Sequence, residues 1–305
     1  MADKDIVEKT LEAYNDVFAD IVNVLLFKGE RIIKENDLED AVSRSHYKAD
    51  DSELHELERD VAKYWSMHNI RIAFLGIENQ TAADPDAPLR SIGYDGIEYR
   101  KQLLADFEKV VDEETGKTKT IKIIKPRFPV ITLWLYFGYK KHWSEPLALH
   151  DCMSIYAPLK PYVNNYKINL FEIAYLTDEQ VNMFQSDFRI VADYFVQMRK
   201  NNDYVPKPDK LKHVHEVLEL MSVMTKDYRF EEIYKKAGKQ VSTMCDALDK
   251  AEERGEKRGR TKERELIITL NNILIDSGRM DDLVKASKDE DYLNKLIAEL
   301  IPQSK

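Results

Sequence analysis

The stretch ERDVAKYWSMHNIRIAFLGIENQ, residues 58–80, decides the fold of this 305-residue chain. Two runs rich in apolar, β-branched and aromatic residues, 61–65 and 70–80, are separated by the short segment 66–69. Strand-forming runs joined by so few residues are typical of a β-hairpin, in which the two strands pair antiparallel. The sequence therefore predicts a hairpin at this point of the chain.

The end of this hairpin carries two acids and an amide. Side chains alternate along a strand, so Glu78 and Gln80 share one face of the second strand. Antiparallel pairing across the short turn brings Asp60 beside Glu78 at the same end. Adjacent carboxylates repel each other unless a cation lies between them, and Mg²⁺ prefers carboxylate oxygens. The pair indicates either a metal site or an ordinary solvated edge of the sheet.

The segments around the hairpin predict an α/β core. Apolar residues at helical spacing over 5–28 predict a first helix, and helical spacing resumes over 89–107 after the proline-containing loop 83–88. Residues 129–138 are the strongest predicted strand of the chain. The expected order is therefore helix, strand, strand, helix, strand.

The rest of the chain differs in composition from this core. We expect the core to span residues 1–145 and a mostly helical region, 146–250, to pack on it, with a helix over 180–200. Residues 251–264 are charged and contain no apolar side chain beyond an alanine, which predicts a linker. Residues 265–305 then form a small helical tail of two short helices broken at a glycine.

Composition narrows the class of protein. Hydrophobic residues make up 43% and charged residues 33% of the chain, which is typical of a globular protein. The net charge is −9, and residues 1–60 carry all of it, so no overall positive field attracts nucleic acid. Cys152 and Cys245 form neither a disulfide framework nor a zinc motif. Because the N-terminus lacks a signal-peptide pattern and no apolar run is long enough to span a bilayer, we expect a cytoplasmic protein without a membrane partner.

Four motifs follow one another within residues 12–200. They are Glu58-Arg-Asp60, Gly76-Ile-Glu-Asn-Gln80, Pro88-Leu-Arg90 with Tyr94, and Pro129-Val-Ile-Thr-Leu-Trp-Leu-Tyr-Phe-Gly138 ending at Trp143. Together they resemble the PD-(D/E)XK nuclease superfamily and, more narrowly, the recombination-promoting nuclease (Rpn) and putative transposase family of bacteria. The resemblance implies a PD-(D/E)XK core with a mixed sheet, a DNA endonuclease that hydrolyses phosphodiester bonds, Mg²⁺ or Mn²⁺ as cofactor and DNA as partner.

The resemblance also assigns roles at the hairpin end. Asp60 and Glu78 match the metal-binding pair, with the main-chain carbonyl of Asn79 as a further ligand, and Gln80 stands where many superfamily members have lysine. Lysine stabilises charge on the phosphate and orients the attacking water, whereas a neutral amide orients water without supplying positive charge. The expected catalytic residues are therefore Asp60, Glu78 and Gln80, with a reduced rate.

Four more residues are candidates for this site. Asp16 and Asp20 lie one helical turn apart, so either is a candidate third metal ligand, or both are surface acids. Arg90 and Tyr94, also one turn apart, are candidate DNA-phosphate contacts through a guanidinium and a hydroxyl. The alternative is that neither residue binds a ligand, and that an exposed arginine simply lies over a half-buried tyrosine.

A second function fits the same residues. The neutral Gln80 and the absence of a basic surface also suit a transposase-derived module that binds DNA or a protein partner without cutting, or a protein-interaction scaffold. The sequence leaves the oligomeric state open, a homo-oligomer included.

Overall fold

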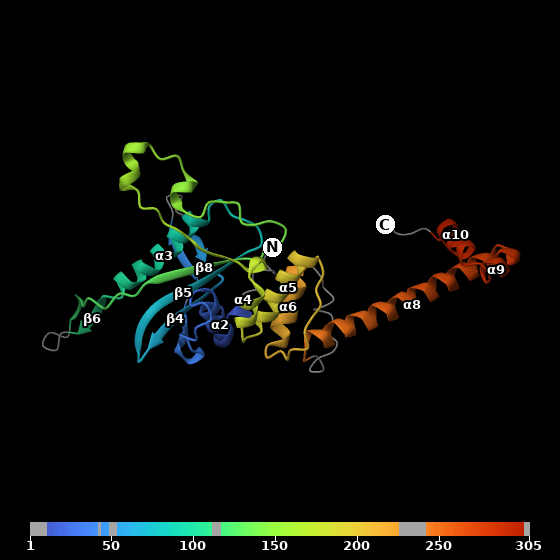
Figure 1. Cartoon of the computed structure of the whole chain (residues 1–305), viewed down its shortest axis with the longest axis horizontal. Coiled ribbons are helices and arrows are strands. Elements are labelled where there is room, and N and C mark those ends of the chain that lie inside the picture. Colours follow the sequence, from blue (N-terminus) through green and yellow to red (C-terminus); the bar gives the residue numbers. More distant parts are fainter. Residues whose placement is uncertain (1–10, 42–43, 49–53, 112–116, 226–241, 302–305) are drawn as a thin grey trace.

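A mixed β-sheet with helices on both faces forms the centre of the molecule (Figure 1). The computed structural model describes residues 11–41, 44–48, 54–111, 117–225 and 242–301. Within these residues the chain is an α/β protein, which confirms the fold class predicted from the hydrophobic patterns.

Five strands make up the central sheet in the order β1-β4-β5-β8-β9. Their bounds are Leu38–Asp40 for β1, Val61–Met67 for β4, Ile70–Gln80 for β5, Val130–Tyr136 for β8 and Asn169–Glu172 for β9. The first three strands pair antiparallel, whereas β5, β8 and β9 run parallel to one another. The predicted hairpin is therefore confirmed, and it forms one half of a mixed sheet.

A two-residue turn fixes the register of the β4–β5 hairpin. His68 and Asn69 both have positive φ, 51° and 62°, as the tight hairpin turns that suit strand twist require. A register shift between Trp65 and Ser66 follows, after which Val61 lies opposite Ile77.

Helices cover the two faces of the sheet. On one face α2 (Asn15–Leu25), α5 (Phe188–Asn201) and α6 (Val214–Thr225) share the main hydrophobic core with alternate residues of β5 and β8. On the other face α3 (Ala87–Leu104) connects the parallel strands β5 and β8 and packs on β8 (Figure 1). Burial on both faces explains why β8 is apolar along almost its whole length.

A buried polar network ties the hairpin to α3 and β8. Arg59 donates from Nη2 to Asp95 Oδ1 at 2.6 Å and from Nε to Thr132 Oγ1 at 3.2 Å, and Tyr166 donates to the other oxygen of Asp95. The Arg59 chain passes directly over Gly76, where an added Cβ would lie 2.6 Å from Arg59 Cδ. Only glycine leaves room for this crossing.

Smaller elements complete the described chain. They are β2 (Arg44–Lys48), β3 (Leu54–Glu58), β6 (Phe107–Val111), β7 (Thr118–Lys122), the 3-10 helices η1 (Glu35–Asp37), η2 (Leu149–Cys152), η3 (Ala157–Tyr162) and η4 (Ile173–Tyr175), and α4 (Asp178–Met183). β2 with β3, and β6 with β7, form separate two-stranded sheets. No helix in the described residues has the length and apolar character needed to cross a membrane.

Two predicted helices differ from the observed ones. The helix expected over 180–200 is divided into α4 and α5. The backbone N–H groups of Gln185 and Ser186 each donate to Asp20 Oδ2 at 2.7 Å instead of to a carbonyl of a continuing helix. The helix expected over 5–28 lies partly outside the described residues, and α2 covers its second half.

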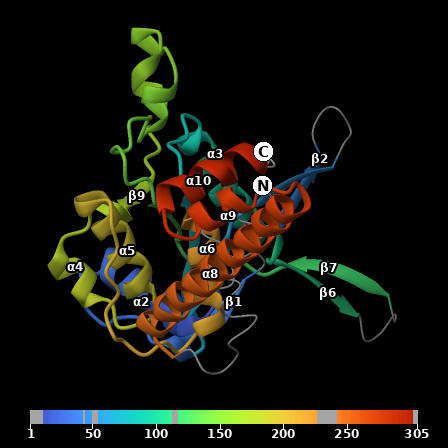
Figure 2. The same ribbon diagram turned by 90° about the vertical axis from the view of Figure 1, so that its right-hand side faces the viewer.

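The charged segment 251–264, predicted as a linker, is helical and lies within one continuous helix. This helix, α8, runs over 33 residues from Met244 to Asp276, and the side chain of Thr243 caps its N-terminus. Glu, Lys, Arg and Ala are good helix formers, so a charged segment without apolar periodicity still continues a helix. Figure 1 shows α9 (Met280–Ala286) and α10 (Glu290–Leu300) at the C-terminal end of α8, and Figure 2 shows the three helices from that end.

The tail has a hydrophobic cluster of its own, separate from the core. The cluster contains the buried residues Leu270, Leu274, Ala286 and Leu296. Met244, at the start of α8, belongs to the main core instead and is fully buried.

Deleting residues 251–305 should therefore leave the stability of the core almost unchanged. Met244→Ala should lower the free energy of unfolding by about 2–5 kcal/mol, because it opens a cavity at a fully buried position. Urea denaturation followed by tryptophan fluorescence compares the full chain, the truncated chain and the Met244→Ala variant. A loss on truncation as large as that of Met244→Ala would show that the tail packs on the core.

Candidate functional site

The hairpin register places two carboxylates together at the end of β4 and β5. Val61 lies opposite Ile77, so the next positions outward, Asp60 and Glu78, face each other. Asp60 Oδ2 accepts a hydrogen bond of 2.6 Å from the backbone N–H of Asn79. The structure thus brings Asp60 and Glu78 side by side, as the alternation of the strand predicts.

Glu78 is the buried centre of the site, with 3% of its surface exposed. Its Oε1 accepts from the guanidinium of Arg90, from Gln80 Nε2 at 3.3 Å and from the hydroxyl of Tyr94 at 3.4 Å. Arg90 also donates to the Tyr94 hydroxyl at 2.8 Å and to Asp84 at 2.6 Å. The other carboxylate oxygen of Glu78 is buried and accepts no hydrogen bond from the residues that the structure describes.

Burial controls the protonation of this site. Desolvation, reinforced by the negative charge of Asp60, raises the pKa of Glu78 to about 8, although Arg90 and Arg59 act in the opposite direction. Burial and the neighbouring Glu78 raise the pKa of Tyr94 to about 12, so its hydroxyl keeps its proton. A strongly perturbed acid with specific charged partners is typical of a functional site.

A third acid that was not predicted, Glu12, reaches the same strand end. Its side chain is 2% exposed, and its Oε2 accepts a hydrogen bond of 2.7 Å from the side-chain amide of Asn79. Asn79 therefore connects Glu12 through its side chain with Asp60 through its backbone. Helical spacing from Asp16 did not point to it, because α2 begins only at Asn15, after the extended Tyr14, and Glu12 precedes this break.

Asp16 and Asp20 are placed elsewhere. Asp16 pairs with Lys212 at 2.7 Å and with His213 at 3.1 Å, whereas Asp20 binds Arg31 and the backbone amides that follow α4. Both acids line a separate cavity of about 220 Å³. The structure does not bring either of them to Asp60 and Glu78.

Arg90 and Tyr94 do lie at the site, one turn apart on α3. Tyr94 is buried against Ala87 and Trp134, whereas Arg90 is 35% exposed and bridges Glu78 and Asp84. Arg90 thus brings positive charge to the buried carboxylate from the helix that covers this face of the sheet.

The carboxylate oxygens at this strand end are the type of ligand that a hard divalent cation prefers. Carboxylates from Glu12, Asp60 and Glu78 meet around Asn79, and one buried oxygen of Glu78 has no hydrogen-bond partner. In the described part of the chain, however, no three His, Cys, Asp or Glu side chains lie close enough together to hold a metal ion. A bound cation would share Glu78 with Arg90, which contacts Oε1.

Comparison of the chain with protein-family models, curated proteins and solved structures gave no match. The function is therefore inferred from the geometry of the site.

The raised pKa of Glu78 predicts how stability depends on pH. Between pH 4.5 and pH 8 the unfolded chain releases the Glu78 proton while the folded chain retains it. The free energy of unfolding therefore falls as the pH rises through this range. Glu78→Gln cannot ionise, and its stability relative to the wild type should therefore increase from pH 5 to pH 8. Urea denaturation in EDTA measures this difference, with Glu263→Gln as the exposed control. An equal difference at both pH values would contradict the assignment.

Proposed function

We propose that the chain is a Mg²⁺- or Mn²⁺-dependent DNA endonuclease with a PD-(D/E)XK core, related to the recombination-promoting nucleases. One observation carries the proposal: Asp60 and Glu78 lie beside each other at the end of the hairpin, and Asn79 joins Glu12 to them. The succession α2, β4, β5, α3 and β8 supports the same proposal, although the chain adds β1 and the small sheet β2–β3 before β4, and the small sheet β6–β7 between α3 and β8.

The chain's own residues divide the work. Asp60, Glu78 and the main-chain carbonyl of Asn79 would hold the metal ion, with Glu12 as the acid from the first helical segment in place of Asp16 or Asp20. When bound, the ion polarises the phosphate and lowers the pKa of a water ligand. The amide of Gln80, on the same strand face as Glu78, would orient that water for attack on a DNA phosphodiester.

Arg90 compensates for the lysine that Gln80 replaces. Its guanidinium contacts Glu78 Oε1, the same oxygen to which Gln80 donates. A positive charge at this place stabilises the charge that develops on the phosphate, which a neutral amide cannot do. Water orientation and charge stabilisation would thus come from two residues instead of one lysine.

The second candidate is a module that binds DNA or a protein without cleaving. The contacts of Arg90 with Glu78 and Asp84 favour it, because Arg90 already occupies the acid that a metal ion would need. The two candidates differ in whether the site cuts.

The purified chain should nick plasmid DNA with Mg²⁺ and not with EDTA. Asp60→Ala and Glu78→Ala should each abolish nicking without unfolding the chain, because both residues lie at a strand end. Glu12→Gln should slow it by about 100-fold, the scale expected for a lost charge-stabilising group. Agarose-gel assays measure nicking, and circular dichroism checks the fold.

Asp16→Asn is the matched control for Glu12→Gln, since it removes another acid of this part of the chain, one that pairs with Lys212. Nicking by the folded Asp60→Ala or Glu78→Ala variant at the wild-type rate would refute the proposed site. Binding of DNA without nicking by any protein would favour the second candidate.

A lysine at position 80 tests whether Arg90 supplies the positive charge that Gln80 lacks. Arg90→Gln should slow single-turnover cleavage by about 100-fold, and adding Gln80→Lys should restore most of the rate, because an ammonium on the same strand face replaces the lost charge. Gln80→Ala alone should cut more slowly while metal affinity, measured by calorimetry, is retained. If Gln80→Lys fails to rescue Arg90→Gln in a folded protein that still binds metal, the shared-role explanation is wrong.

A further inference from the structure

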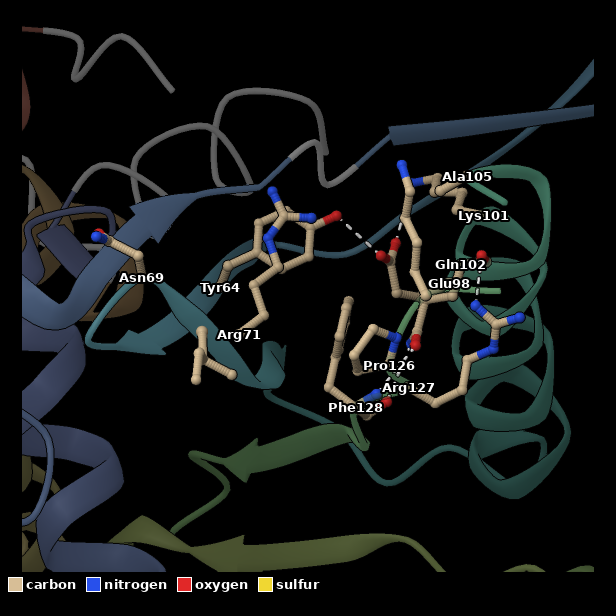
Figure 3. A pocket seen from close by; sticks show the side chains of 12 residues that line it. Tyr64, Asn69, Arg71, Glu98, Lys101, Gln102, Ala105, Pro126, Arg127 and Phe128 are labelled. Carbon is tan, nitrogen blue, oxygen red and sulfur yellow. Dashed lines mark hydrogen bonds and ion pairs between the residues drawn. The ribbon is translucent and has the colours of Figure 1, made fainter. Parts of the chain in front are cut away.

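A second cavity lies at the opposite end of the hairpin from Glu78. Its volume is about 570 Å³, within the range of small-molecule sites. Figure 3 shows the residues that line it, which come from the β4–β5 turn region, the second half of α3 and the segment before β8. Arg71 and Glu78 are seven residues apart on β5, about 23 Å at ~3.3 Å per residue, so this cavity is separate from the carboxylate site.

Aromatic rings form one wall of the cavity. The rings of Tyr64 and Phe128 meet edge to face, with centroids 5.9 Å apart and planes at 88°. The Arg71 guanidinium lies 3.9 Å above the centroid of the Tyr64 ring (Figure 3). Ile70 and Pro126 add apolar surface beside these rings. A flat aromatic ligand can stack on such a wall.

A buried acid faces the same space. Glu98 is 1% exposed and accepts a hydrogen bond of 2.9 Å from the Tyr64 hydroxyl through Oε1. Its Oε2 is buried and accepts no hydrogen bond, although the Lys101 ammonium lies 3.2 Å away. Lys101 compensates the charge of Glu98, while Oε2 can still accept a hydrogen bond from a ligand N–H group.

Cations surround the mouth of the cavity. Lys101, Lys125 and Arg127 each pair with an acid, namely Glu98, Glu108 and Asp106. Arg71 is exposed, and in the part of the chain that the structure describes it has no acidic partner. A guanidinium of this kind is suited to bind a phosphate with two parallel hydrogen bonds.

We propose that this cavity binds a purine nucleotide. The base packs against Phe128 and the Arg71–Tyr64 stack and donates N–H groups to Glu98, while the outer N–H groups of Arg71 bind the phosphate. Guanine fits best, because its ring N–H and amino group are adjacent donors. The nucleotide comes either free or as one unit of a nucleic-acid strand, and both sources present the same base and phosphate. The site does not depend on the proposed nuclease activity.

Calorimetry in EDTA with GMP, guanosine and inorganic phosphate tests the assignment on the full chain. GMP should bind with one-to-one stoichiometry and at least tenfold more tightly than guanosine or phosphate, because base and phosphate are both recognised. Arg71→Ala should weaken GMP binding at least tenfold, whereas Arg100→Ala, an exposed arginine of α3 outside the cavity, should not change it. Ile70→Trp fills the cavity from an exposed position and should also block binding.

Lack of GMP binding by the wild type would overturn the proposal, as would equal affinity for GMP and phosphate. GMP binding that survives both Arg71→Ala and Ile70→Trp in folded proteins would overturn it too. Displacement of GMP by a guanine-containing tetranucleotide identifies a strand as the source, and lack of displacement identifies the free nucleotide. Glu78→Gln should bind GMP like the wild type, so loss of nuclease activity and loss of this site are distinguishable.

Discussion

The register of the β4–β5 hairpin is the constraint on which the other features depend. The turn at His68 and Asn69 sets it, and a slip of one residue would move every side chain of β5 to the opposite face of the sheet. In the observed register the apolar residues of β5 enter the core below α2, while Glu78 turns toward α3 and faces Asp60. The same register carries Arg71 to the other end of the strand, above Tyr64. Polar and charged side chains thus lie at both ends of one hairpin, and the apolar core holds the strands between them in place.

The buried acid at the hairpin end works against stability. Glu78 is almost fully buried beside Asp60 and loses hydration, and its contact with Arg90 offsets only part of this cost. A chain selected for stability alone would place an apolar residue at position 78. Retention of Glu78, with an oxygen that accepts no hydrogen bond, is the kind of local conflict expected at a functional site.

The sequence predicted the features that follow from local periodicity. Strand alternation identified the pair Asp60 and Glu78, and the apolar run before Gly138 identified β8. Helical spacing also presented Asp16 and Asp20 as candidates, but periodicity alone does not say where their helix faces the sheet, and Glu12, before the break at Tyr14, was missed. The contact between Arg90 and Glu78 depends on how α3 crosses the sheet, which is tertiary information. The charged segment 251–264 was predicted as a linker because it lacks apolar positions, but composition alone did not predict that one helix would run through it from Met244 to Asp276.

The crossing of Arg59 over Gly76 couples these two positions, because a substitution at one restricts what the other can be. Any side chain at position 76 would collide with the arginine, and a shorter residue at position 59 would leave Asp95 buried without its cation. Neither position can drift alone, so in related chains the two residues should be exchanged together or kept together.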